Sequence, residues 1–281
     1  MEKEAHRRVV ERREMRASDT EVVFPTSAAE AIQAFGDGRD VTVFAGGTIL
    51  MAARAYGRFP PTPRTLMLDR AGLDELGGDG TVVIGAMTRL STLAGSGLEP
   101  LASAAADVAD VEIRAQATLG GNLCAPPGLE SPRGDLQAPL LAVGARVSSA
   151  AAGGEETEPV EEFLARALED PRLVLAVEFE RPRRASYLSQ RRPHTHSYAV
   201  MSVACAETSD GVRVAAGGIG PKASRLEAVE RALANGAAPE EAAAAAEGAV
   251  QPADDALASG WYRSAVLPTL IRRALEHLQG A

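Results

Sequence analysis

The sequence predicts an α+β protein built from two successive regions that meet near residue 170. Before that point, short apolar runs alternate with amphipathic segments, which is the pattern of strands and helices in α/β subdomains. After it, apolar runs follow one another before three helical segments, which is typical of an α+β domain. Two predicted loops also carry adjacent glycines, Gly46-Gly47 and Gly120-Gly121, where the backbone can approach a ligand closely.

The first region is predicted to start with a strand at Glu21–Pro25, after an arm of mixed charge formed by the first twenty residues. We interpret the arm as a flexible, solvated segment, with a helix that contacts a partner as the alternative. Thr26 or Ser27 can cap a helix over Ala28–Phe35, and Glu30 is placed to complete a capping box.

The other elements follow from apolar periodicity and from the turn residues between them. In the first region the predicted strands are Val41–Ala45, Thr65–Leu68, Thr81–Ile84, and a hairpin of Leu140–Ser149 with Glu156–Val160 around Gly153-Gly154. Its predicted helical segments are Leu73–Leu76, Thr88–Ala94, Pro100–Val108 and Val160–Leu168, while Ile113–Leu123 is predicted as extended and turn structure. In the second region the predicted strands are Leu173–Phe179, Tyr198–Ala206 and Gly211–Ala216, and the predicted helices are Ser224–Ala234, Glu240–Val250 and Ser264–Leu278.

The composition limits the possible functions. The 281 residues carry a net charge of −9, which argues against nucleic-acid binding because that function needs a basic face. The two cysteines, Cys124 and Cys205, are too few for a disulfide framework or for an iron–sulfur cluster, which generally takes four thiolates. No apolar run is long enough for a membrane span, and the N-terminus lacks the apolar core of a secretion signal, so a cytoplasmic protein is expected.

The two glycine loops are the main functional signal. The strand Val41–Ala45 leads into Gly46-Gly47-Thr48, and Thr118-Leu119 precedes Gly120-Gly121-Asn122. Backbone amides in such bends supply partial positive charge, and the Thr and Asn side chains can bond anionic oxygens. Together the loops predict two walls that hold a pyrophosphate, while an ordinary turn is the alternative for either loop alone.

The two commonest nucleotide-binding motifs are absent from the chain. It contains no G-x-x-x-x-G-K-[ST], so it is not a P-loop NTPase. It contains no G-x-G-x-x-G either, because Gly95-Ser96-Gly97 is followed by Leu98-Glu99-Pro100 and the Gly217–Gly220 stretch has the wrong spacing. A Rossmann dinucleotide site is therefore not predicted.

Five ordered motifs give the chain a family resemblance. They are Ala45-Gly46-Gly47-Thr48, Ile84-Gly85-Ala86-Met87-Thr88, Ile113-Arg114 with Thr118–Leu123, Asp135-Leu136, and Trp261-Tyr262-Arg263-Ser264. In this order the set resembles the FAD-binding medium subunit of the molybdenum hydroxylases, the flavoprotein of xanthine dehydrogenase and carbon monoxide dehydrogenase type. The resemblance extends from about Glu21 to Leu278.

The resemblance implies a vanillyl-alcohol-oxidase (PCMH)-type FAD-binding domain over residues 21–170 and a C-terminal α+β domain over residues 171–281. The FAD-binding domain would consist of two α/β subdomains, at about residues 21–78 and 79–170. Amides of the two loops would bind the FAD pyrophosphate, Asp135 would bind ribityl or ribose hydroxyls, and Leu175 and Tyr187 would line the isoalloxazine. The implied cofactor-binding residues are Ala45, Gly46, Gly47, Thr48, Ile49, Leu50, Thr118, Gly120, Gly121, Asn122, Asp135, Leu175 and Tyr187.

Several residues near these motifs have more than one interpretation. A plain helix cap before Leu136 is the alternative role for Asp135. Cys124 is interpreted as a packing thiol, with a redox role as the alternative. His194 and His196 are interpreted as exposed polar residues or flavin or partner contacts, because no third ligand for zinc accompanies them.

The function implied by the resemblance is electron transfer. FAD would take electrons from the iron–sulfur clusters of a small 2Fe-2S subunit and pass them to NAD⁺, a quinone or oxygen, while a large molybdopterin subunit oxidises the substrate. Such subunits assemble as heterotrimers, which are often doubled. Two other functions stay open: a non-catalytic FAD-binding scaffold or sensor, and a free-standing flavin reductase or oxidase of the same fold.

Overall fold

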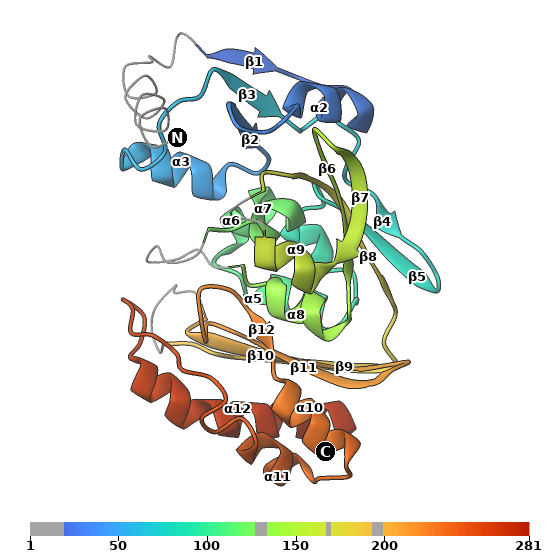
Figure 1. Ribbon diagram of the computed structural model, residues 1–281, viewed down its shortest axis with the longest axis vertical. Coiled ribbons are helices and arrows are strands. Elements are labelled where there is room, and N and C mark those ends of the chain that lie inside the picture. Colours follow the sequence, from blue (N-terminus) through green and yellow to red (C-terminus); the bar gives the residue numbers. More distant parts are fainter. Residues whose placement is uncertain (1–19, 127–133, 167–169, 193–198, 281) are drawn as a thin grey trace.

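The computed structural model describes residues 20–126, 134–166, 170–192 and 199–280. Three sheets follow one another along the longest axis of the molecule (Figure 1). We call the parts around them the N-terminal, central and C-terminal units. None of the helices in the described ranges combines the length and apolar character that crossing a lipid bilayer requires.

The N-terminal unit has a parallel sheet in the order β1-β3-β2, formed by Glu21–Val23, Arg64–Met67 and Val41–Phe44. Its helices are α2 (Ala28–Phe35) and α3 (Thr48–Ala55). The predicted capping box is confirmed. The Ser27 hydroxyl accepts the Glu30 amide at 3.2 Å, and the Glu30 carboxylate accepts the Thr26 amide at 2.7 Å.

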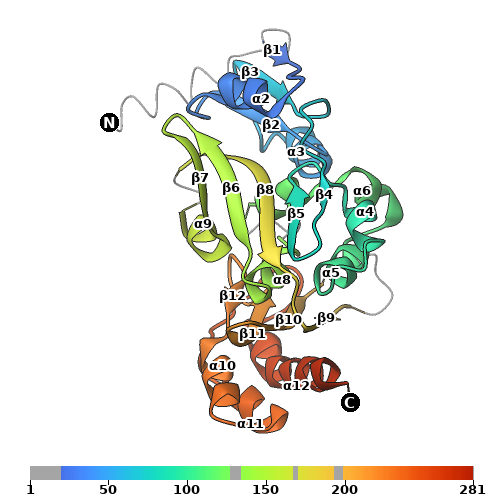
Figure 2. The same ribbon diagram turned by 90° about the vertical axis from the view of Figure 1, so that its right-hand side faces the viewer.

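The central unit has an antiparallel sheet in the order β4-β5-β8-β6-β7, whose breadth is seen in Figure 2. Its strands are Leu76–Gly77, Thr81–Gly85, Leu173–Glu180, Arg146–Ala151 and Gly154–Pro159. Its helices are α4 (Leu90–Ala94), α5 (Leu101–Asp107), α6 (Val111–Gln116), α7 (Leu119–Leu123), α8 (Gln137–Ala142) and α9 (Val160–Arg166). The strand β8 lies beyond the predicted boundary near residue 170, but it pairs with β5 and β6 of the first region.

Three predicted elements of the central unit are wrong. The helical turn at Leu73–Leu76 is instead an extended segment that ends in β4, where Leu76 pairs with Ile84. The stretch Ile113–Leu123 is two short helices, because Asp110 and Thr118 each cap a turn too short to show helical periodicity. The first strand of the hairpin starts only at Arg146, since Leu140 lies in α8, although the turn at Gly153-Gly154 is confirmed.

The C-terminal unit has an antiparallel sheet in the order β12-β11-β10-β9, formed by Ser224–Arg225, Gly211–Gly217, Met201–Thr208 and Arg184–Gln190. Helices α10 (Glu227–Ala234), α11 (Pro239–Ala244) and α12 (Gly260–Gln279) lie beneath this sheet in Figure 1, and α8 contacts its other face. The sequence missed β9, whose Arg and Ser residues break the apolar alternation. The predicted helix at Ser224 begins only at Glu227, because Ser224 and Arg225 pair with β11.

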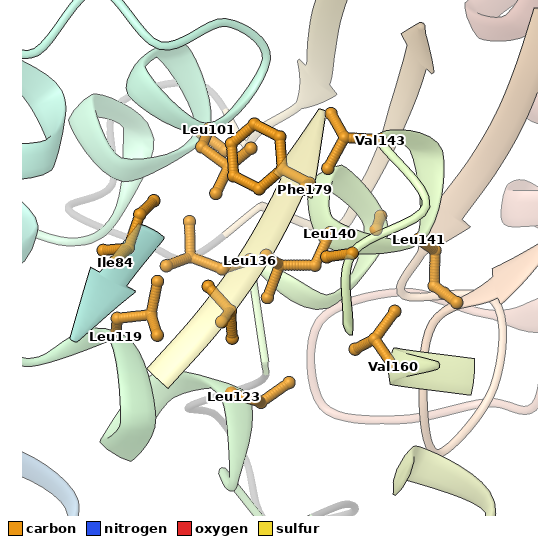
Figure 3. Close-up of a cluster of buried hydrophobic side chains, with 14 of the residues drawn as sticks. Ile84, Leu101, Leu119, Leu123, Leu136, Leu140, Leu141, Val143, Val160 and Phe179 are labelled. Carbon is orange, nitrogen blue, oxygen red and sulfur yellow. The ribbon is translucent and has the colours of Figure 1, made fainter. Parts of the chain in front are cut away.

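The largest core cluster joins the central sheet to the short helices that follow it. Figure 3 shows Ile84 of β5 on the same side of the cluster as Leu119 of α7, while Phe179 of β8 lies near Leu101 of α5. Each of these side chains is at most 4% exposed, and burying such a side chain contributes about 1.5–3 kcal/mol. The core therefore fixes α7, and with it the second glycine loop.

Candidate functional site

A cavity of about 580 Å³ lies between the N-terminal and central units. This volume is within the range of roughly 300–1,000 Å³ found for small-molecule sites. Eleven of the thirteen predicted site residues line it: Ala45, Gly46, Gly47, Thr48, Ile49, Leu50, Thr118, Gly120, Gly121, Asn122 and Asp135. The two glycine loops, which are more than seventy residues apart in the sequence, therefore converge on one space, as the sequence predicts.

The first glycine loop, Ala45–Thr48, has the shape that only glycine allows. Gly47 has φ +72°, and a Cβ there would also lie 2.5 Å from the ring of Phe44. A Cβ on Gly46 would lie 2.1 Å from the carbonyl oxygen of Gln116, the last residue of α6. This loop is thus pressed against the backbone that leads into the second loop.

The first turn of α3 offers backbone donors to the cavity. The first amide of this helix to find a helical acceptor is that of Met51, which donates to the Gly47 carbonyl at 2.9 Å. The amides of Thr48, Ile49 and Leu50 have no acceptor among the described residues. Free amides and the helix dipole together favour an anion at this position.

The second glycine loop, Thr118–Asn122, uses its amides within the protein. The Gly120 amide donates to the Ala86 carbonyl at 2.8 Å, and the Gly121 amide donates to the Thr118 hydroxyl at 3.2 Å. Thr118 is the N-cap of α7. The amides of Gly120 and Gly121, which are predicted to bind the FAD pyrophosphate, thus already have acceptors within the chain.

Asn122 joins the second loop to the acidic residue of the site. Its Nδ2 donates to Asp135 Oδ2 at 3.3 Å, and its Oδ1 accepts the Leu136 amide at 2.9 Å. Both Asn122 and Asp135 line the cavity. The alternative role for Asp135 as a helix cap is not found, because α8 begins after Leu136 without a side-chain cap.

The structure leaves Leu175 and Tyr187 out of this cavity. Leu175 is 9% exposed and packs in the core beneath the N-terminal sheet. Tyr187 of β9 lines a separate cavity of about 410 Å³ with Ser103 and His277. Burial raises the pKa of the Tyr187 hydroxyl, and the nearby carboxylate of Asp135 raises it further, so the phenol stays protonated close to the acidic end of the main site.

The sequence missed two basic residues in the cavity wall, Arg58 and Arg172. Arg172 is fixed by a hydrogen bond from its Nε to Ser149 Oγ at 2.7 Å, and its side chain is 8% exposed. Its guanidinium also lies 3.5 Å from Glu156 and 3.7 Å from Asp170. Neither arginine belongs to a motif with regular spacing, so nothing in the sequence indicates its place at the site.

The Cys124 thiol opens onto the cavity, where the surrounding protein raises its pKa to about 12. It is therefore a neutral thiol at physiological pH and not an activated nucleophile. Within the described ranges, no group of three or more His, Cys, Asp or Glu residues could hold a metal ion. His194 and His196 lie outside the described residues.

Comparison with solved structures gives the class of protein. The chain superposes on carbon monoxide dehydrogenase from Hydrogenophaga pseudoflava with a TM-score of 0.81 and 26% identity, covering 95% of this chain and 99% of that one. Quinoline 2-oxidoreductase from Pseudomonas putida 86 has a TM-score of 0.80 with 22% identity over 95% and 99% of the two chains. The latter likeness shows a shared fold alone. The fold is thus that of a subunit found in multi-subunit oxidoreductases.

Sequence comparison gives the family. Residues 16–180 match the family described as the FAD binding domain in molybdopterin dehydrogenase, and residues 185–278 match the CO dehydrogenase flavoprotein C-terminal domain. The medium chain of carbon monoxide dehydrogenase from H. pseudoflava is 29% identical over 278 residues, with 90% of this chain and 94% of that one covered. The protein YgfM of Escherichia coli K12 is 30% identical over 253 residues, which cover 88% and 92% of the two chains.

The chain belongs to this family of FAD-binding subunits of molybdopterin dehydrogenases. The resemblance inferred from the five motifs is confirmed, and so are the α+β fold and FAD as the cofactor. The break between the two matched segments falls between residues 180 and 185, directly after β8.

Proposed function

We propose that this chain is the electron-transfer subunit of a molybdenum hydroxylase complex. It would receive electrons from a small 2Fe-2S subunit and deliver them to NAD⁺, a quinone or oxygen, while a large molybdopterin subunit oxidises the substrate. The proposal is supported by family membership and by the likeness to the medium chain of carbon monoxide dehydrogenase.

The observation that carries the site assignment is the set of amides at the start of α3 that have no acceptor in the described part of the chain. We place the FAD diphosphate on the amides of Thr48, Ile49 and Leu50, where backbone donors supply positive charge without a lysine. Gly120 and Gly121 would form the opposite wall, where Gly120 packs closely against Ala86 and Gly121 would admit the ligand through its lack of a side chain. The FAD, when bound, supplies the one- and two-electron chemistry, and the chain holds and shields it.

We assign roles to Asp135, Tyr187 and Leu175 from their positions. Asp135 would accept hydrogen bonds from ribityl or ribose hydroxyls, held in place by the Asn122 amide. Tyr187, outside the main cavity but close to the charge of Asp135, would border the flavin ring. Leu175 is buried behind the wall and would act only through packing. The cytoplasm stays the predicted compartment.

Absorption spectroscopy of the purified chain with added FAD tests the proposal. A Cβ on Gly121 would meet only the Thr118 hydroxyl, at 3.1 Å, so Gly121→Val should leave the fold intact and fill the ligand space. We expect this variant to lose the bound-flavin spectrum. Gly95→Val is the matched control, since this exposed glycine is also helical in φ and ψ and does not line the cavity. Normal FAD binding by Gly121→Val would refute the site assignment.

The same preparation separates the proposed function from its alternatives. A free-standing reductase would reduce its own flavin with NADH and turn over without partners. A scaffold or sensor would bind FAD but exchange no electrons with an iron–sulfur partner. The electron-transfer subunit should show flavin reduction by the reduced partner complex, measured as bleaching of the flavin absorption in stopped flow.

A further inference from the structure

The side chain of Gln137 connects the C-terminal unit to the cavity wall. Gln137 is the first residue of α8 and is 4% exposed. Its Nε2 donates to the Leu123 carbonyl at 2.9 Å, and its Oε1 accepts the Ala223 amide at 3.1 Å. Leu123 ends α7, whereas Ala223 directly precedes β12 of the C-terminal sheet. One buried amide group therefore bridges two units that are far apart in the sequence.

The helix α7, which Gln137 contacts at Leu123, is too short to be stable without contacts to the rest of the protein. A five-residue helix forms little internal hydrogen bonding, and its last carbonyls lack helical donors. Gln137 supplies one of these donors at Leu123, directly after the cavity-lining residues Gly120 to Asn122. The end of the second glycine loop is thus fixed by a side chain that does not itself line the cavity.

A second tie lies beside the first. Asn122 holds the Asp135 carboxylate and the Leu136 amide, so the chain on both sides of Leu136 is bound to α7. Gln137 in this group also reaches the C-terminal unit by a hydrogen bond, through the Ala223 amide. The position of the Ala223 amide is consequently coupled to α7 through Gln137.

We propose that Gln137 is a positioning residue for the cofactor. By its two hydrogen bonds it sets α7 and Asp135 relative to the C-terminal unit, and so sets the shape of the wall that meets the flavin nucleotide. This inference rests on the FAD site proposed above. Gln137 acts through Leu123 and Asp135 and makes no contact with FAD.

Lys222 provides a matched control one residue from Ala223. Its Nζ donates to the carbonyls of Leu164 and, at 3.3 Å, Ala165 near the end of α9. This contact joins the same two units, but neither carbonyl belongs to the cavity wall. Lys222→Met therefore loosens the seating of the C-terminal unit without releasing α7.

The test compares Gln137→Met, Gln137→Glu and Lys222→Met in the full chain. Methionine keeps the length of the side chain and removes both bonds, whereas glutamate keeps an acceptor for Ala223 and loses the donor to Leu123. We expect both Gln137 variants to raise the Kd for FAD about tenfold, because binding would then also have to order α7 and Asp135. At saturating FAD the visible circular dichroism of the bound flavin should also change. Lys222→Met should lower the thermal midpoint, with a Kd within about twofold of the wild type and an unchanged flavin spectrum.

Other results would contradict the positioning role of Gln137. Wild-type Kd and flavin dichroism in both Gln137 variants would overturn the inference, as would an equal loss of affinity in Lys222→Met, which would show general loosening. If Gln137→Met does not fold, Gln137→Glu decides, and failure of both to fold would show a folding role instead of a positioning role. Absence of FAD binding by the wild-type chain would refute the proposed function and not this inference alone.

Discussion

The loop Ala45–Thr48 and the loop Thr118–Asn122 both contain adjacent glycines and both line the cavity, but their amides have different partners. In the first loop, the amides of Thr48, Ile49 and Leu50 have no acceptor in the described parts of the chain. In the second, the amides of Gly120 and Gly121 already donate to Ala86 and to Thr118.

The difference shows what a glycine pair does and does not indicate. Missing Cβ atoms reveal where the backbone must come close to something, which holds for both loops. Whether donors remain for a ligand depends on the helix that follows and on its cap. The helix α3 begins at Gly47 without a side-chain cap, whereas α7 is capped by Thr118, so the first loop is suited to bind an anion and the second to shape the space.

The largest expected effect comes from forcing the loops apart. Gly46→Ala places a Cβ 2.1 Å from the Gln116 carbonyl, which cannot move without displacing the end of α6. Such overpacking should lower the free energy of unfolding by about 1–3 kcal/mol. If FAD binding needs the closed arrangement, its affinity should fall about 5- to 150-fold for the same energy.

Chemical denaturation and FAD titration measure the two effects of Gly46→Ala. Gly153→Ala, in the β6–β7 turn, is the control because a Cβ there meets nothing within 4 Å. Equal stability and affinity in the two variants would show that the loops do not need their close contact.

The sequence alone located the first loop and much of its setting. The capping box at Thr26, Ser27 and Glu30 fixed the start of α2 because it acts over four residues and needs no tertiary contact. The glycine pairs were identified for the same reason, since a backbone constraint is visible in residue type. The convergence of the two loops was predicted from their occurrence as a pair and is seen in the cavity lining.

What the sequence missed depends on distant partners. The helices α6 and α7 contain six and five residues, fewer than two turns, and their caps have meaning only once the core fixes them. The Gly120 amide donates its hydrogen bond to the carbonyl of Ala86, thirty-four positions earlier in the sequence. Neither residue type indicates that the two backbones meet. Arg172 likewise reaches the cavity wall only because Ser149 of a neighbouring strand holds it.

A smaller effect is expected where the second loop is capped. Thr118→Ala removes the acceptor of the Gly121 amide, and loss of an N-cap typically costs about 1 kcal/mol of stability. The Gly121 amide then becomes available to a ligand in the cavity. The loss in binding free energy for FAD should therefore be smaller than the loss in the free energy of unfolding. Calorimetry and FAD titration measure both quantities. Thr118→Ser retains the hydroxyl and should behave as the wild type, and an equal loss in both variants would exclude the cap as the cause.

The smallest effect concerns Cys124, which follows the second loop in the cavity wall. Because the surrounding protein raises the pKa of this thiol above the value near 8.5 of an ordinary cysteine, little thiolate should be present at pH 8. Alkylation by iodoacetamide between pH 7 and 9.5, followed by mass spectrometry in a Cys205→Ser background, should therefore be slow and should still accelerate at the top of this range. A rate that levels off near pH 9 would mean that water reaches the wall of the second loop freely. The expectation that the protein around the second loop disfavours the thiolate would then be wrong.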